Sequence, residues 1–218
     1  IEWWGPVINE YYGGTETGAV VFVTSQEALN KPGTVGRPLD FSTVRIYDEV
    51  GGVLPRGEIG EVYVWIDGWP DFTYRGLDAQ RREVGRDGLV SCGDIGYLDA
   101  DGYLFLCDRS RDMVISGGVN IYPAEIEAVL IDMPGVQDCA VFGIPDEEFG
   151  ESLCAYVQPE AGQDLTPDEV RSWLQPRLAN YKLPRTIEFA AELPREDSGK
   201  IFKRRLREPY WQKTGRAI

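Results

Sequence analysis

The sequence contains no histidine, which removes a common metal ligand and the usual base of a nucleophilic dyad. Its four cysteines, Cys92, Cys107, Cys139 and Cys154, show no Cys-x-x-Cys spacing. Most zinc sites and every Ser-His or Cys-His pair are therefore excluded, and any metal must be a hard cation held by oxygen atoms. We expect the cysteines to be reduced thiols in or near the cores of a cytoplasmic protein.

The sequence also lacks an apolar run near the roughly 18 residues of a membrane-spanning helix, and its N-terminus lacks the pattern of a signal peptide. Positive charge is scarce, because 22 Lys and Arg stand against 36 Asp and Glu, a net charge of −14. Such a surface argues against a general nucleic-acid partner. With 43% hydrophobic and 27% charged residues, the composition is that of an ordinary globular protein with one or two cores.

Strand patterns dominate the chain up to about residue 110. Apolar and polar residues alternate at 44–48 and 61–65, and a tight turn separates two further strands at 96–98 and 103–107. The short spacing between these segments predicts antiparallel strands in this part of the chain.

Strands and helices alternate after residue 112. The sequence predicts strands at 113–115, 137–144 and 153–158, and helices at 123–133 and about 167–178. A proline suits the first turn of each helix, and Thr166 and Glu169 form a capping box at the second. The fold class that we expect is mixed α/β, with the chain dividing into two units between residues 110 and 111.

Four short segments carry the residues that could do chemistry. They are Tyr12-Gly13-Gly14-Thr15-Glu16, Cys92-Gly93-Asp94, Asp108-Arg109-Ser110-Arg111-Asp112 and Ser198-Gly199-Lys200. Paired glycines let a backbone turn closely beside a ligand, and a carboxylate can accept hydrogen bonds from two neighbouring hydroxyls. Taken singly, each segment is a common turn or a solvated surface segment, and a lone lysine after glycine is normally a surface charge.

Together and in this order, the four segments resemble the second half of the AMP-forming acyl-CoA synthetases. This adenylate-forming family includes acyl- and aryl-CoA ligases, peptide-synthetase adenylation domains and luciferases. The resemblance covers nearly the whole chain, and it implies that residues 1–110 are the C-terminal, β-rich portion of a large adenylating domain and that residues 111–218 are a small mobile lid domain.

The family's Ser/Thr/Gly-rich phosphate loop, which lies upstream of the Tyr-Gly-x-Thr-Glu segment, does not occur in the sequence. The sequence also begins at Ile1 instead of methionine. We therefore expect a C-terminal piece of a longer enzyme, one that cannot form an acyl-adenylate by itself.

The resemblance implies a role for each residue of the nucleotide site. Tyr12 would pack on adenine within the turn that contains Gly13, Thr15 would bind phosphate, Glu16 would act in catalysis by holding Mg²⁺, Asp94 would accept the ribose hydroxyls, and Arg109 would contact ribose or phosphates. Cys92 stands where the family commonly has threonine, which affects how Asp94 is positioned but leaves its carboxylate in place.

The resemblance implies roles for the second unit as well. Arg111 would be the hinge, at a position where relatives usually carry lysine or aspartate. Gly117 and Gly118 would line the tunnel through which CoA attacks. Lys200 would be the catalytic cation that neutralises the incoming carboxylate and the pentacovalent transition state.

The implied reaction has two halves. ATP and a carboxylic acid, in the first instance a fatty acid, give acyl-AMP and pyrophosphate, and the thiol of CoA then displaces AMP. Two alternatives remain open: an enzyme that passes the acyl group to a carrier protein, and a degenerate domain that binds nucleotide or a protein partner without catalysis.

Overall fold

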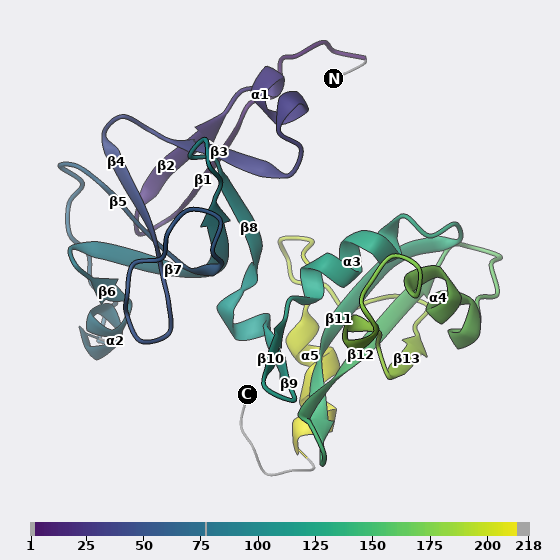
Figure 1. Cartoon of the computed structure of the whole chain (residues 1–218). Coiled ribbons are helices and arrows are strands. Elements are labelled where there is room, and N and C mark those ends of the chain that lie inside the picture. The colour runs from purple at the N-terminus through teal and green to yellow at the C-terminus, as the bar shows by residue number, and fades with distance from the viewer. Residues whose placement is uncertain (1–2, 77, 213–218) are drawn as a thin grey trace. The chain divides into compact units, whose positions relative to one another are not determined.

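The computed structural model describes residues 3–76 and 78–212 of the chain (Figure 1). The chain divides into two compact units, Ile1–Arg111 and Asp112–Ile218. Each unit has its own sheet and its own buried core. The mixed α/β class that the sequence predicts is confirmed.

The first unit is built on an eight-stranded sheet. Its strands are β1 Glu10–Gly14, β2 Gly18–Val23, β3 Thr34–Pro38, β4 Ser42–Tyr47, β5 Gly60–Ile66, β6 Gly85–Arg86, β7 Leu89–Leu98 and β8 Leu104–Arg109. They lie in the order β1-β2-β3-β8-β7-β5-β4, with β6 paired to β7. Each pairing is antiparallel, as the alternating patterns predict.

Two short helices, α1 Ser25–Asn30 and α2 Asp78–Glu83, accompany this sheet. Helix α1 begins with a capping box, in which Thr24 accepts from the backbone of Glu27 and the Glu27 carboxylate accepts from the backbone of Thr24. Glu27 therefore fixes the start of the helix that precedes β3.

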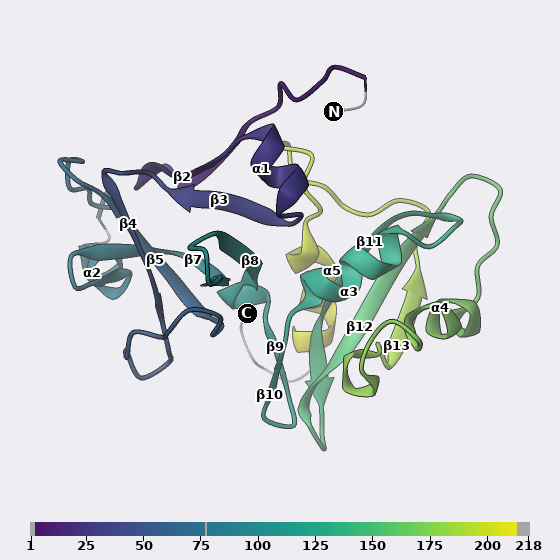
Figure 2. The ribbon, with the colours of Figure 1, turned by 45° about the horizontal axis from the view of Figure 1, so that its top comes forward.

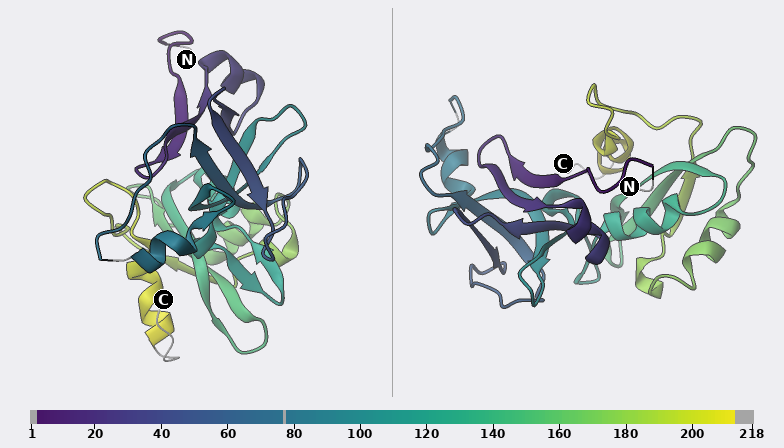
Figure 3. Two further views of the ribbon diagram at one scale, coloured as in Figure 1. Left: turned by 90° about the vertical axis from the view of Figure 1, so that its left-hand side faces the viewer. Right: turned by 90° about the horizontal axis from the view of Figure 1, so that it is seen from above.

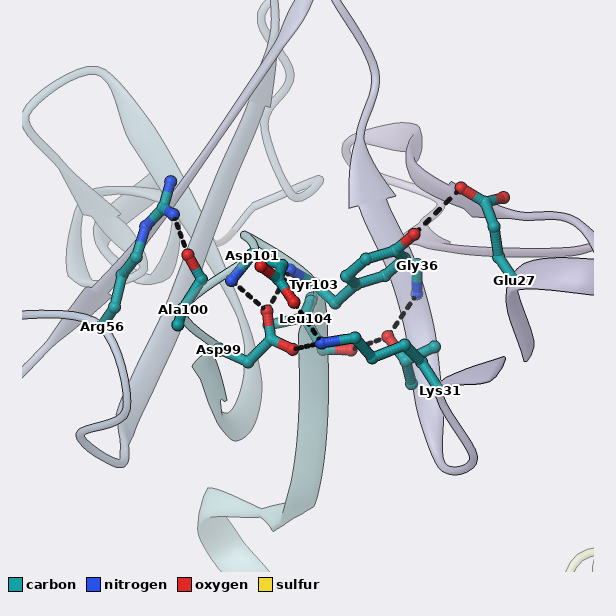
Figure 4. A network of polar contacts seen from close by, with 10 residues as sticks. Glu27, Lys31, Gly36, Arg56, Asp99, Ala100, Asp101, Tyr103 and Leu104 are labelled. Atoms are coloured by element: carbon teal, nitrogen blue, oxygen red, sulfur yellow. Dashed lines mark hydrogen bonds and ion pairs between the residues drawn. The ribbon is translucent and has the colours of Figure 1, made fainter. Parts of the chain in front are cut away.

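A polar network joins α1 to the turn between β7 and β8 (Figure 4). The ammonium of Lys31 lies 2.6 Å from a carboxylate oxygen of both Asp99 and Asp101. The hydroxyl of Tyr103 donates to Glu27 over 3.2 Å. These contacts tie the β7–β8 turn to α1. Both β7 and β8 carry candidate site residues.

The main core of the first unit is formed by side chains from β1, β2, β4, β5 and β8. Its buried members are Tyr12, Val20, Val21, Ile46, Val62, Val64, Ile66 and Leu104. Tyr12 is the one candidate site residue among them, so the position of its ring is set by the packing of β1, β2 and β5.

The second unit has a five-stranded sheet. Its strands are β9 Val114–Ser116, β10 Val119–Ile121, β11 Val136–Asp146, β12 Gly150–Pro159 and β13 Thr186–Phe189. They lie in the order β10-β9-β12-β11, with β13 parallel to β12. The β9–β10 hairpin joins β12 through the pairing of Ser116 with Gly150 (Figure 2).

Helices cover both faces of this sheet (Figure 3). Helices α3 Pro123–Ile131 and α4 Pro167–Leu174 pack on one face, where Val141 and Ala155 are buried. Helix α5 Lys203–Gln212 packs on the other face, against Phe142 and Cys154. Successive residues of β11 and of β12 therefore serve opposite cores, which is why both strands read as continuous apolar runs.

The helix starts that the sequence predicts are confirmed, including the capping box of Thr166 and Glu169. Helix α4 is shorter than predicted, because it ends at Leu174 instead of about residue 178. Pro176 explains the difference, since proline has no backbone N–H to donate to the next helical hydrogen bond. Among the described residues, no helix has the length and apolar character that crossing a membrane requires.

Candidate functional site

A tight turn connects β1 to β2 and carries the first candidate segment. The strand pairing is irregular between Tyr12 and Gly13, and a Cβ atom at Gly13 would overlap the carbonyl group of Gly18. Thr17, which is fully buried, accepts a hydrogen bond from the backbone N–H of Gly14 over 3.0 Å. The turn is therefore closed by local contacts, and glycine is required at position 13 for lack of space.

Thr15 and Glu16 lie at the tip of this turn. Thr15 is exposed and Glu16 is half-buried. The hydroxyl of Tyr74 donates to one carboxylate oxygen of Glu16 over 3.0 Å. Burial, and then the bond to Glu16, raise the pKa of Tyr74, so its hydroxyl remains a donor and holds the carboxylate in one orientation.

Asp94 is the centre of a cluster with Tyr12 and Arg109. It lies on β7 directly opposite Arg109 on β8. One carboxylate oxygen accepts from the hydroxyl of Tyr12 over 2.7 Å, and the other lies 2.9 Å from Nε of Arg109. Burial, and then the Asp94 carboxylate, raise the pKa of Tyr12, so this phenol keeps its proton and remains the hydrogen-bond donor to Asp94.

Cys92 connects the Tyr12–Asp94–Arg109 cluster to the β1–β2 turn. Its backbone carbonyl accepts from Arg109 over 3.3 Å, which gives the guanidinium a second fixed contact. Its sulfur lies 3.9 Å from the hydroxyl of Thr17 in the turn. Burial raises the pKa of the Cys92 thiol, so the thiol stays protonated and packs as a small neutral side chain.

The second unit presents a glycine turn between β9 and β10. Gly117 and Gly118 both have positive φ angles, +58° and +81°, as two-residue hairpin turns of this kind require. The N–H of Gly117 donates to the carbonyl of Phe149 over 2.9 Å, and a Cβ at Gly117 would lie 3.0 Å from the Phe149 ring. Gly118 has open space around it, so the turn presents a bare stretch of backbone to solvent.

The remaining candidate residues are exposed. Arg111 lies in a single 3₁₀ turn, Ser110–Asp112, and is the last residue of the first unit. Lys200 follows Gly199 in a surface loop between β13 and α5. Their roles as hinge and catalytic cation stay predictions.

Within the described residues, no group of three or more acidic or cysteine side chains could hold a metal ion by itself. A magnesium ion at Glu16 would therefore take most of its ligands from nucleotide phosphates and water, which is how Mg²⁺ is commonly bound. Glu16 suits such an ion. One of its carboxylate oxygens accepts from Tyr74, and the other is left to coordinate Mg²⁺ beside the exposed residue Thr15.

Sequence reasoning identified Tyr12, Asp94 and Arg109 separately, and the structure brings them into direct contact. It missed two residues. Thr17 had a local signal, because threonine often caps a turn by bonding a backbone N–H three residues away. Tyr74 had none, since 58 residues separate it from Glu16.

Two family models match the chain. The AMP-binding enzyme model matches residues 2–69, and the model of the AMP-binding enzyme C-terminal domain matches residues 125–200. The first match includes the turn of Tyr12 to Glu16, and the second includes Lys200 and the strands β11, β12 and β13 of the second unit.

Curated relatives carry ligase names. A feruloyl-CoA synthase of an Amycolatopsis species is 42% identical over 202 residues, which are 91% of this chain and 40% of the relative. A fatty acid–[acyl-carrier-protein] ligase of Streptomyces coeruleorubidus is 39% identical over 96% of this chain and 41% of the relative. A long-chain-fatty-acid–CoA ligase of Mycobacterium tuberculosis is 40% identical over 94% and 40%. The chain thus spans about 40% of the length of these relatives.

Solved structures agree with the sequence relatives. The o-succinylbenzoate CoA synthetase of Bacillus subtilis with its acyl-adenylate intermediate matches with a TM-score of 0.84 and 32% identity, over 94% of this chain and 42% of that one. ATP-bound MatB of Rhodopseudomonas palustris matches with a TM-score of 0.82 and 36% identity, over 93% and 40%. The resemblance that the sequence motifs indicate is confirmed, and the chain belongs to the family of AMP-binding, adenylate-forming enzymes.

Proposed function

We propose that the chain supplies the ribose and metal contacts, the lid and the catalytic lysine of an AMP-forming acid–thiol ligase. In the first half-reaction, a carboxylate oxygen of the acid attacks the α-phosphorus of ATP, and pyrophosphate leaves. In the second, the thiol of CoA attacks the acyl carbon and AMP leaves with the electron pair of the broken bond. The Tyr12–Asp94–Arg109 cluster is the observation that carries this proposal.

The Asp94 carboxylate suits a ribose. An ionised carboxylate has about four acceptor positions. Tyr12 and Arg109 each use one, on different oxygens, so one position remains on each oxygen. Two adjacent hydroxyls, such as the 2′- and 3′-hydroxyls of a nucleotide, match this pair. Because Tyr12 is 9% exposed and its hydroxyl is bound to Asp94, adenine would contact only the edge or one face of its ring.

The β1–β2 turn suits the phosphates. The exposed hydroxyl of Thr15 is available to a phosphate oxygen, and Glu16, oriented by Tyr74, would hold Mg²⁺ beside it. When bound, the ion supplies positive charge that offsets the charge of the phosphates. Gly13 and Gly14 have no side chains, so a phosphate could come close to the backbone of the turn.

The second unit would act as the mobile lid, with Arg111 as its hinge. Lys200 is exposed on one of its loops, where its ammonium could neutralise the attacking carboxylate and the transition state of adenylation. Gly118 lies at the tip of a hairpin with open space around it, which would let the pantetheine arm of CoA pass. Rotation of the lid would move Lys200 away from the reacting atoms and bring Gly118 to them.

A carrier protein is the second candidate for the acceptor thiol, because one relative is named a fatty acid–[acyl-carrier-protein] ligase. We favour CoA, since the other relatives named above are CoA synthases or ligases. We favour a fatty acid as the acyl donor, since two of the named relatives are fatty-acid ligases. A non-catalytic role is disfavoured, because Glu16, Asp94, Arg109 and Lys200 are all retained. No disulfide joins the four cysteines, which fits the reducing cytoplasm.

The experiment uses the enzyme with its upstream residues and measures pyrophosphate release over a panel of carboxylic acids, followed by acyl transfer to CoA or to a holo carrier protein. Lys200→Ala should slow adenylation by on the order of 10²- to 10³-fold and leave conversion of supplied acyl-AMP nearly normal. Gly118→Trp should do the reverse. The proposal is wrong if no acid supports pyrophosphate release, and the lid mechanism is wrong if both variants lose the same half-reaction.

A further inference from the structure

The loop that carries Lys200 is a closed hairpin. Its two ends are bridged at Arg195 and Ile201. The N–H of Glu196 donates to the carbonyl of Lys200, and the N–H of Gly199 donates to the carbonyl of Glu196, both over 2.8 Å. Lys200 therefore stands at the base of a four-residue turn, although its side chain is exposed.

The side chain of Arg195 braces this hairpin. One terminal nitrogen of its guanidinium donates to the carbonyl of Gly199 over 2.8 Å. The other terminal nitrogen forms an ion pair with the carboxylate of Asp138 on β11. Asp138 is itself oriented, because its second oxygen accepts from the N–H of Cys139 over 2.8 Å. Arg195 thus ties the hairpin to the central sheet of its unit.

The point of attachment matters for Lys200. The carbonyl of Gly199 and the N–H of Lys200 belong to one planar peptide group, so a contact that orients the carbonyl also orients the bond leading to the lysine. Gly199 has a φ angle of +85° and no side chain, and such a residue could otherwise place the following peptide in several orientations.

We infer that Arg195, held by Asp138, is a positioning residue for Lys200 and that it acts by fixing the Gly199–Lys200 peptide. This inference rests on the proposed role of Lys200 in adenylation. Arginine suits the task because its planar fork binds a carbonyl and a carboxylate at once, whereas the ammonium of lysine reaches one of them at a time.

The test measures both half-reactions for Arg195→Met, Asp138→Asn and Arg195→Lys in the enzyme with its upstream residues. Because a misplacement of about 1 Å can cost on the order of 100-fold, Arg195→Met should lower kcat for adenylation roughly 10- to 100-fold with little change in KM for ATP. Asp138→Asn should cost less, and Arg195→Lys should restore part of the loss. Conversion of supplied acyl-AMP and CoA should stay near the wild-type rate.

Arg171 provides a matched control in the same unit. Its guanidinium also bridges an aspartate, Asp168 at 3.3 Å, and a backbone carbonyl, that of Arg185 at 3.2 Å. Its side chain is 45% exposed, against 42% for Arg195. Arg171→Met removes the same kind of contact from helix α4, and we expect adenylation to remain within about threefold of the wild type, as is usual for an exposed ion pair.

Hydrogen exchange gives a readout that does not depend on activity. In Arg195→Met the amide protons of Glu196 and Gly199 should exchange faster, whereas those of β11 and β12 should not change. The double variant Arg195→Met/Asp138→Asn should lose no more adenylation than Arg195→Met alone, because both changes remove one shared contact.

The inference is overturned if Arg195→Met adenylates within threefold of the wild type, if it slows both half-reactions equally, or if Arg171→Met slows adenylation as much. Should Arg195→Met fail to fold, Arg195→Lys and Asp138→Asn decide the question in the same assays. A wild-type enzyme without adenylation would refute the proposed function instead, and faster exchange in the hairpin would then still show the brace.

Discussion

Replacement of Asp94 by asparagine tests the centre of the proposed nucleotide site. The change preserves the shape of the side chain but removes its charge and one of its two acceptor oxygens. In the wild type one carboxylate oxygen accepts from the hydroxyl of Tyr12, and the other accepts from the guanidinium of Arg109.

Asparagine cannot satisfy all of these donors at once. Its oxygen must face Arg109, because a guanidinium has no acceptor, so its NH₂ group faces the Tyr12 hydroxyl. The ribose hydroxyl on that side then loses its acceptor, and the bond on the other side becomes neutral. Hydrogen bonds to charged groups contribute about 1.5–3 kcal/mol, against about 0.5–1.5 for neutral ones, so nucleotide binding should weaken by about 2–4 kcal/mol, or roughly 30- to 1,000-fold.

Calorimetric titration of AMP into the enzyme with its upstream residues measures this loss. Thermal unfolding with and without AMP separates binding from folding, since a variant that folds but does not bind keeps its transition and loses the shift caused by AMP. Asp48→Asn is the control, because Asp48 accepts from the N–H of Gly52 in a surface turn away from the cluster. Binding of AMP to Asp94→Asn within threefold of the wild type would refute the assignment of Asp94 to the ribose.

Three further changes test other parts of the molecule. Tyr74→Phe removes the donor that orients Glu16, and we expect about a tenfold rise in the Mg²⁺ concentration needed for half-maximal adenylation. Glu27→Gln should lower thermal stability at neutral pH, because hydrogen bonds from Thr24 lower the pKa of Glu27 in the folded state. The difference from the wild type should disappear as the pH falls below the ordinary pKa of glutamate and through this lowered pKa, since the stabilisation is lost on protonation. Arg111→Pro should slow thioester formation more than adenylation, and equal losses would argue against a hinge.

The local elements of this fold could be predicted from sequence because their signals lie within a few residues. The alternation at residues 44–48 indicated β4, and the capping box at Thr166 indicated α4. The shortened end of α4 could also have been predicted, since Pro176 lies inside the range that we assigned to the helix. Local chemistry decides these features, so one sequence is enough to find them.

Contacts between distant segments could not be predicted in this way. The pairing of Tyr74 with Glu16 and the brace from Arg195 to Asp138 join residues 58 and 57 positions apart. Each depends on how loops and strands that are distant in the sequence pack together in the fold, and no spacing in the sequence encodes that. The family resemblance supplied the residues for which we propose substrate contacts, whereas the structure was needed to find the residues that hold them.

The second unit also shows why one lid would need two orientations. The Lys200 hairpin is braced to Asp138, near the start of β11, whereas the Gly117–Gly118 turn is bonded to Phe149, just beyond the end of β11 at Asp146. Eight residues of strand separate Asp138 from Asp146, and at about 3.3 Å per residue this corresponds to roughly 26 Å. Side-chain motion cannot cover such a span, so the lid that we propose would bring Lys200 and Gly118 to the same acyl-phosphate only in turn, by rotating as a whole.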